Sequence, residues 1–178
     1  MDRIPIVSRV LDVVQWIGLV IGVAMIVAMA TLMNVEIAGR TLFGVSTQIA
    51  DEYAGYFFTA ATMLCFVPAL REGRFLRVEG LISLLPGRPR AIIEVFAAIV
   101  GAVTCAVLAD ATFDLAAASA SFGTRSLQPS ETPLVIPQAV MPFGFGVLAI
   151  AFLEWGTLCA IRLWRGELPQ EGPLNAVD

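Results

Sequence analysis

The chain has 178 residues, of which 58% are hydrophobic and 15% are charged, with a net charge of −4 and a mean hydropathy of +0.83. Soluble domains are about 45–50% apolar and about 25% charged, so this composition predicts an integral membrane protein. Histidine and lysine are both absent. Their absence excludes Ser-His or Cys-His catalysis, metal or haem ligation by histidine, and a Walker A loop. The acidic balance gives no basic stripe for nucleic acid.

Four apolar segments predict four membrane-spanning helices, which we place over residues 12–40, 50–72, 89–118 and 137–165. A spanning helix needs about 20 mostly apolar residues, and lipid forces such segments to pair their backbone internally as helices. The first apolar run, 13–35, is longer than the ~7–15 residues of a signal-peptide core, so we expect this helix to be retained. We therefore expect one all-α membrane domain over residues 1–178.

The segment after the second helix is predicted to form a short amphipathic helix over residues 74–86. Phe75, Val78, Ile82 and Leu85 share one face of a helical projection, which is typical of an element lying along the membrane interface. Anionic lipid would attract its arginines. We expect residues 167–178 to form a flexible tail.

Arginine is distributed unevenly between the two sides of the predicted bundle. Nine arginines lie in the N-terminal segment, the loop after the second helix and the C-terminal segment, whereas only Arg40 and Arg125 lie in the other two loops. Cytoplasmic segments carry the excess of positive charge, so both termini and the middle loop are predicted to be cytoplasmic.

Several charged residues mark the ends of the predicted helices. Glu36 and Arg40 are one turn apart, which favours either an ion pair that extends the first helix or a polar anchor against a partner. Asp51 and Glu52 open the second helix and Arg71 ends it, as the helix dipole favours.

Three further acids are weaker candidates for a functional site. Asp110 and Asp114 are one turn apart where the third helix is expected to emerge into water, although a cation site is an alternative. Glu154 either pairs with another helix or reaches the cytoplasmic interface. The three cysteines lie in separate apolar runs, so we expect no metal or other cofactor. A Gly18–Gly22 pair, with GxxxG spacing, permits close helix packing.

Three segments in this order, NVEIAGRTLFGVS, DEYAGYFF and ALREGRFLRVEGL, resemble the small membrane subunit of tripartite ATP-independent periplasmic (TRAP) transporters, the DctQ-type family. Phe75 and Glu79 stand where that family usually has histidine and aspartate, so the histidine has no essential role in this chain. The resemblance is carried by Arg40, Phe43, Asp51, Glu52, Arg71, Gly73, Arg77, Val78, Glu79, Leu134, Ile136, Pro137 and Pro142.

The resemblance implies a scaffold subunit of a multi-pass complex in the bacterial inner membrane, rather than an enzyme. A large permease subunit (DctM-type) would carry the transport pathway and the sodium sites. A periplasmic substrate-binding protein (DctP-type) would deliver an organic acid and dock transiently. The small subunit would brace the large one within the lipid.

Two other functions remain open at this point. The first is a stand-alone four-helix channel or exporter that uses Asp110 and Asp114, or Glu154, as ion sites. The second is a membrane anchor for an enzyme or for electron transfer, for which the sequence offers no histidine and no paired cysteines.

Overall fold

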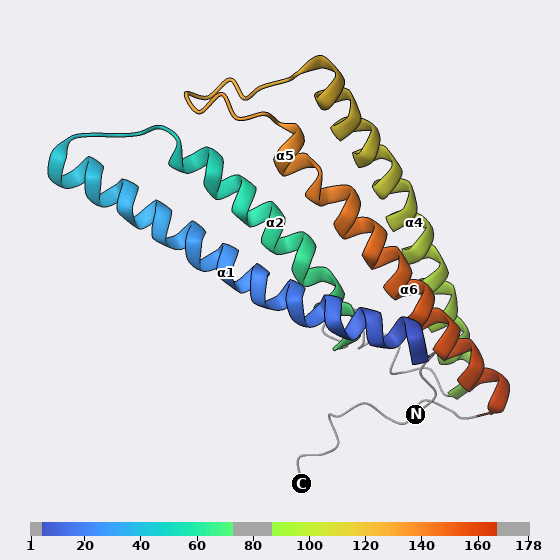
Figure 1. Cartoon of the computed structure of the whole chain (residues 1–178). Helices are drawn as coiled ribbons and strands as arrows, with labels where there is room; N and C mark the ends of the chain where they lie inside the picture. The colour runs from blue at the N-terminus through green and yellow to red at the C-terminus, as the bar shows by residue number, and fades with distance from the viewer. Residues whose placement is uncertain (1–4, 73–86, 167–178) are drawn as a thin grey trace, which may run out of the picture.

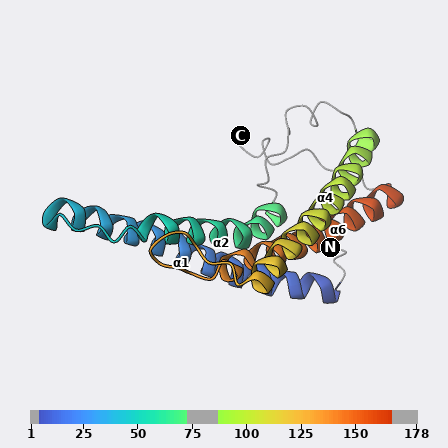
Figure 2. The ribbon, with the colours of Figure 1, turned by 90° about the horizontal axis from the view of Figure 1, so that it is seen from above.

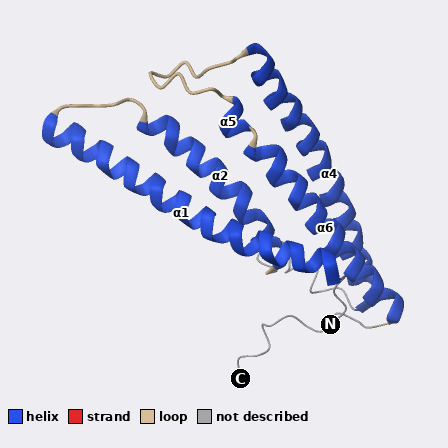
Figure 3. Cartoon of the chain, viewed as in Figure 1, coloured by secondary structure: helices blue, strands red, loops and turns tan. Residues whose placement is uncertain are grey.

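A computed structural model describes residues 5–72 and 87–166 of the chain, and its regular elements in these ranges are helices joined by loops (Figures 1 and 3). The helices are α1 (Pro5–Phe43), α2 (Ala50–Arg71), α4 (Gly87–Phe122), α5 (Val135–Gln138) and α6 (Val140–Arg165). Four helical stretches, with α5 and α6 taken together, are long and apolar enough to cross a membrane. The prediction of an all-helical protein with four such helices is confirmed.

Two helices extend beyond the predicted bounds. α1 begins at Pro5 rather than at residue 12, since proline suits the first turn of a helix and the charge of Asp12 is paired with Arg71. α4 runs from Gly87 to Phe122 rather than over 89–118, because its small-residue end is rich in alanine, a strong helix former. α2 ends at Arg71, one residue before the predicted end at 72. The predicted interfacial segment 74–86 and the tail 167–178 lie outside the described residues.

The last predicted helix, 137–165, is interrupted near its start. Its helical residues begin at Val135, and Ala139 separates α5 from α6. Pro142 has no N–H to donate to the carbonyl of Gln138, which would be the helical partner of that position. Pro137, expected to be the first helical residue, instead lies inside α5.

The four long stretches form one layer in the order α1, α2, α6, α4 (Figure 1). α1 and α2 form one hairpin, α4 and α6 form the other, and α2 packs on α6 between them. One end of the layer, here called the arginine-rich end, carries Arg9, Arg71, Arg88, Arg90, Arg162 and Arg165. The opposite end, called the arginine-poor end, carries Arg40 and Arg125.

The two hairpins converge at the arginine-rich end and splay apart at the arginine-poor end (Figure 1). Viewed from above, they run in different directions, as two arms set at an angle (Figure 2). α1 has 39 residues, and at 1.5 Å per residue it is about 58 Å long. The hydrocarbon core of a bilayer is only about 30 Å thick, so α1 has to be tilted in a membrane or extend beyond it.

Glycines allow the helices to approach one another closely. A Cβ added at Gly18 would lie 2.8 Å from the backbone oxygen of Leu64, and one added at Gly22 would lie 2.6 Å from Cys65 Sγ. The GxxxG pair therefore packs α1 against α2. At the junction of the hairpins, a Cβ added at Gly144 of α6 would lie 2.7 Å from Met63 Cβ of α2.

The layer has only a thin core. In the most apolar window of each spanning stretch, 11% to 22% of the residues are buried. The connected core cluster of buried residues is Leu11, Val67, Leu70, Cys105, Leu148 and Ala151. Large apolar side chains such as Val27, Phe96 and Phe113 are more than half exposed. The faces of the layer therefore need lipid or another membrane protein to cover them.

Candidate functional site

A charged cluster joins three helices at the arginine-rich end. The Arg71 guanidinium, at the end of α2, donates to Asp12 Oδ1 over 2.7 Å and to Gln15 Oε1 over 3.1 Å, both on α1. Its Nε lies 3.4 Å from Glu154 Oε2 of α6. The Arg71 side chain is 12% exposed and that of Glu154 is 4% exposed, whereas Asp12 is 48% exposed. Arg71 thus binds the first hairpin to the second.

Glu154 follows the first of the two alternatives that the sequence left open, because it pairs with another helix. Only one of its oxygens takes part, since Oε1 is buried and has no hydrogen-bond partner among the residues that the structure describes. A buried carboxylate costs several kcal/mol unless it is paired, so the Arg71 guanidinium is the group that makes this acid tolerable inside the layer.

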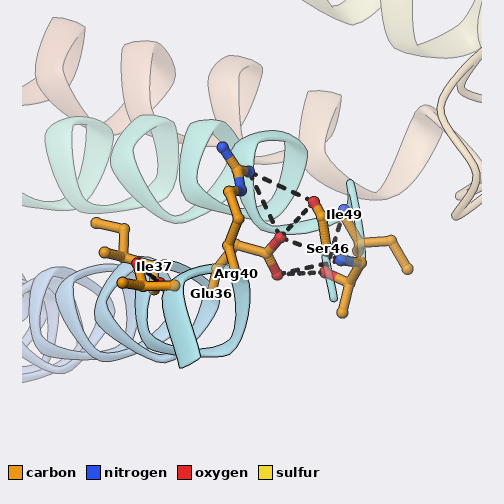
Figure 4. Close-up of polar contacts among 7 residues, drawn as sticks. Glu36, Ile37, Arg40, Ser46 and Ile49 are labelled. Atoms are coloured by element: carbon orange, nitrogen blue, oxygen red, sulfur yellow. Dashed lines mark hydrogen bonds and ion pairs between the residues drawn. The ribbon is translucent and has the colours of Figure 1, made fainter. Parts of the chain in front are cut away.

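Glu36 closes the loop between α1 and α2 at the arginine-poor end (Figure 4). Its carboxylate accepts hydrogen bonds from Ser46 Oγ over 2.7 Å, from Thr47 Oγ1 over 2.7 Å and from the Thr47 backbone N–H over 3.1 Å. Arg40, whose side chain is 61% exposed, lies 3.6 Å from the same carboxylate. The Glu36–Arg40 pair is present, but the main task of Glu36 is to hold the turn.

Glu52 holds the loop that follows α4 against α2. It accepts hydrogen bonds from the hydroxyls of Tyr56 and Ser130. Ser130 in turn accepts from Thr132 Oγ1 over 2.9 Å, and Tyr53 completes the chain through its 3.1 Å hydrogen bond to Thr132. The acid that opens α2 therefore fixes a loop 78 residues further along the sequence.

A pocket of about 480 Å³ opens beside Glu52 at the arginine-poor end. α2 supplies one wall, and the loop after α4, α5 and the start of α6 supply the other. Here it is called the acidic groove, lined by Asp51, Glu52, Gly55, Tyr56, Thr59, Gln128, Leu134, Pro137, Gln138 and Met141. Within residues 5–72 and 87–166, the side-chain oxygen of Gln138 is buried without a hydrogen-bond partner.

The remaining candidates are scattered rather than gathered into one site. Phe43 is 77% exposed at the end of α1. Asp110 and Asp114 are exposed on α4, an outer helix of the layer, and lie outside the acidic groove. Gly73, Arg77 and Glu79 lie outside the described residues. Over the described ranges, no group of three or more acidic or cysteine side chains is placed to hold a metal ion.

The sequence reasoning missed the partners of these charged residues. Asp12 and Gln15 were not candidates, although Arg71 binds both. Ser46 and Thr47 were also missed, and the signal for them was available, since two adjacent hydroxyl residues lie in the short loop that precedes the acidic pair. Nothing in the sequence pattern pointed to Gln138.

Comparison with known proteins places this layer of helices in a family. No curated protein sequence and no solved structure matches the chain. One family model does match it, over residues 29–159, and that family is described as "Tripartite ATP-independent periplasmic transporters, DctQ component". The match runs from within α1 to near the end of α6 and includes the Glu36 turn, the acidic groove, Arg71 and Glu154, whereas Asp12 and Gln15 precede it. The chain is therefore a multi-pass membrane protein of the DctQ family, a small subunit of a TRAP transporter.

Proposed function

We propose that this subunit is a scaffold that braces the large permease subunit during uptake of an organic acid. The observation that carries the proposal is the single layer of helices with its thin core. A layer one helix thick leaves two wide apolar faces, and a larger membrane protein packed on one face would bury what the chain alone leaves exposed.

The family and the arginine distribution support the rest of the proposed arrangement. Sodium sites and the transport pathway belong to the large DctM-type subunit, and a DctP-type periplasmic protein delivers the substrate. The subunit lies in the inner membrane of a bacterium, with its arginine-rich end and both chain termini on the cytoplasmic side. We expect the subunit to hold no cofactor of its own.

The stand-alone channel is the weaker alternative, because its acidic residues do not line a common path. Asp110 and Asp114 lie exposed on an outer helix, and Glu154 is neutralised by Arg71 at the other end of the layer. The helices also lie side by side instead of surrounding a lumen (Figure 1). An intramembrane acid that serves ion passage normally faces a water-filled cavity or a bundle interior.

Reconstitution tests this function directly. The chain, its large subunit and its binding protein are purified and placed in proteoliposomes with an inward sodium gradient, and uptake is measured for a radiolabelled organic acid found to bind the binding protein. We expect uptake with all three components and none when the small subunit is omitted. Sodium-driven uptake by this chain alone, or failure of the large subunit to bind it, would overturn the proposal.

A further inference from the structure

We propose that the acidic groove receives a membrane-spanning helix of the large subunit, with a basic side chain of that helix set against Asp51 and Glu52. The inference rests on the proposed function, since it names the surface through which the scaffold holds its partner. Depth, charge and open space in the groove each support this occupant.

The groove extends from the first turn of α2 along its membrane-spanning part. Asp51 and Glu52 lie in the first turn of α2, and Thr59 lies about 12 Å further along the helix at 1.5 Å per residue. The lining between them is mostly apolar or small, with Gly55, Leu134 and Met141 contributing. A water-soluble protein that docks at the membrane surface would not enter this depth, whereas a helix of a membrane-embedded subunit runs through it.

The groove is lined by two carboxylates, and no lysine or arginine is among the lining residues. Asp51 is exposed and, within the described part of the chain, has no hydrogen bond or ion pair. Glu52 is the second carboxylate, and the buried oxygen of Gln138 has no donor. A basic side chain supplies positive charge and N–H donors, so it complements this set better than a neutral or acidic one.

Gly55 leaves space for a close approach by a second helix. A Cβ added at Gly55 would meet no heavy atom within 4 Å. Gly146 of α6 is equally open, but five residues separate it from the groove residue Met141, which places it about 140° around the helix. The two glycines therefore permit matched substitutions, one in the groove and one away from it.

The experiment is co-expression with a tagged large subunit, followed by affinity purification in mild detergent. Gly55→Leu adds a side chain to the groove whose Cβ meets no other part of the described chain, and Gly146→Leu, whose Cβ is equally free, is its control. Asp51→Lys reverses charge in the groove, and Asp110→Lys does so at an exposed acid on α4. Asp51→Lys would place like charges across the interface, which costs several kcal/mol, and Gly55→Leu would occupy the space of the partner helix. We therefore expect each groove variant to retain about a tenth or less of the large subunit. Both controls should retain it fully.

A second measurement keeps the inference testable if a groove variant fails to fold, as judged by gel filtration of the variant alone. A photoreactive phenylalanine analogue at position 59 should cross-link to the large subunit in the intact complex. Cross-linking only to lipid or to the binding protein would overturn the inference, as would groove variants that bind like their controls. If the unmodified chain itself did not bind the large subunit, the proposed function would fail instead.

Discussion

Removal of the Arg71 side-chain charge tests how the two hairpins are held together. Arg71→Met keeps the apolar stem of the side chain but removes the cation that is paired with Glu154, which is 4% exposed, in the described part of the chain. Asp12 also loses its partner, but it is 48% exposed and can turn to water. We therefore expect nearly all of the loss in stability to come from Glu154.

The size of the loss can be worked out from the distance between the charges. Two unit charges 3.4 Å apart attract by about 5 kcal/mol at an effective dielectric constant of 20. Removing one member of a buried pair typically costs about 3–5 kcal/mol, which agrees with that figure. The half-exposed Asp12 pair adds only about 0–1 kcal/mol, because solvent screens it. The expected loss of unfolding free energy is about 3–5 kcal/mol.

Reversible unfolding by sodium dodecyl sulfate in mixed micelles, followed by tryptophan fluorescence, measures this loss. The double variant Arg71→Met/Glu154→Met replaces the pair by apolar groups and should return to within about 1 kcal/mol of the original chain. Arg162→Met, at an exposed arginine of α6, should stay within about 0.5 kcal/mol. If Arg71→Met matched Arg162→Met, or if the double variant were no more stable than Arg71→Met, the account of the cluster would be wrong.

Three further predictions concern other parts of the layer. Gly22→Leu should destabilise the α1–α2 hairpin by about 1–3 kcal/mol in the same assay, because its first added atom would lie 2.6 Å from Cys65 Sγ. Glu36→Leu removes the acceptor of the loop before α2, so the Thr47 amide should exchange its hydrogen at least tenfold faster, as mass spectrometry would detect. Asp114→Asn should leave uptake by the reconstituted transporter unchanged, whereas a loss of uptake would favour the channel.

The sequence predicted the helices well because lipid imposes a simple rule on them. A long apolar run without charges has to be helical in a bilayer, and the positions of the charged residues along the sequence reveal such runs. The same rule misplaced the start of α1, because Asp12 was taken as the helix limit. In the fold this charge is paired with Arg71, so the helix continues past it to Pro5.

The neighbours of each helix were beyond sequence reasoning. Arg71 and Glu154 meet because α2 packs on α6, and that seam depends on the shape of Gly144 against Met63. Periodicity describes one helix at a time, so it carries no information about such a seam. The acidic groove was missed for the same reason. One wall is α2, and the other is formed by the loop after α4, α5 and the start of α6, more than 60 residues further along the sequence.

The splay of the two hairpins has a mechanical consequence. From Asp12, at the joint, to Phe43 α1 extends over 31 residues, or about 46 Å. A rotation of about 5° at the joint would therefore move the far tip of α1 by about 4 Å. The hydrogen bonds Glu52–Ser130 and Tyr53–Thr132 join the two hairpins at the arginine-poor end, so a rotation about the Arg71 cluster would strain them. A subunit bound at the arginine-poor end would therefore influence the angle between the two hairpins.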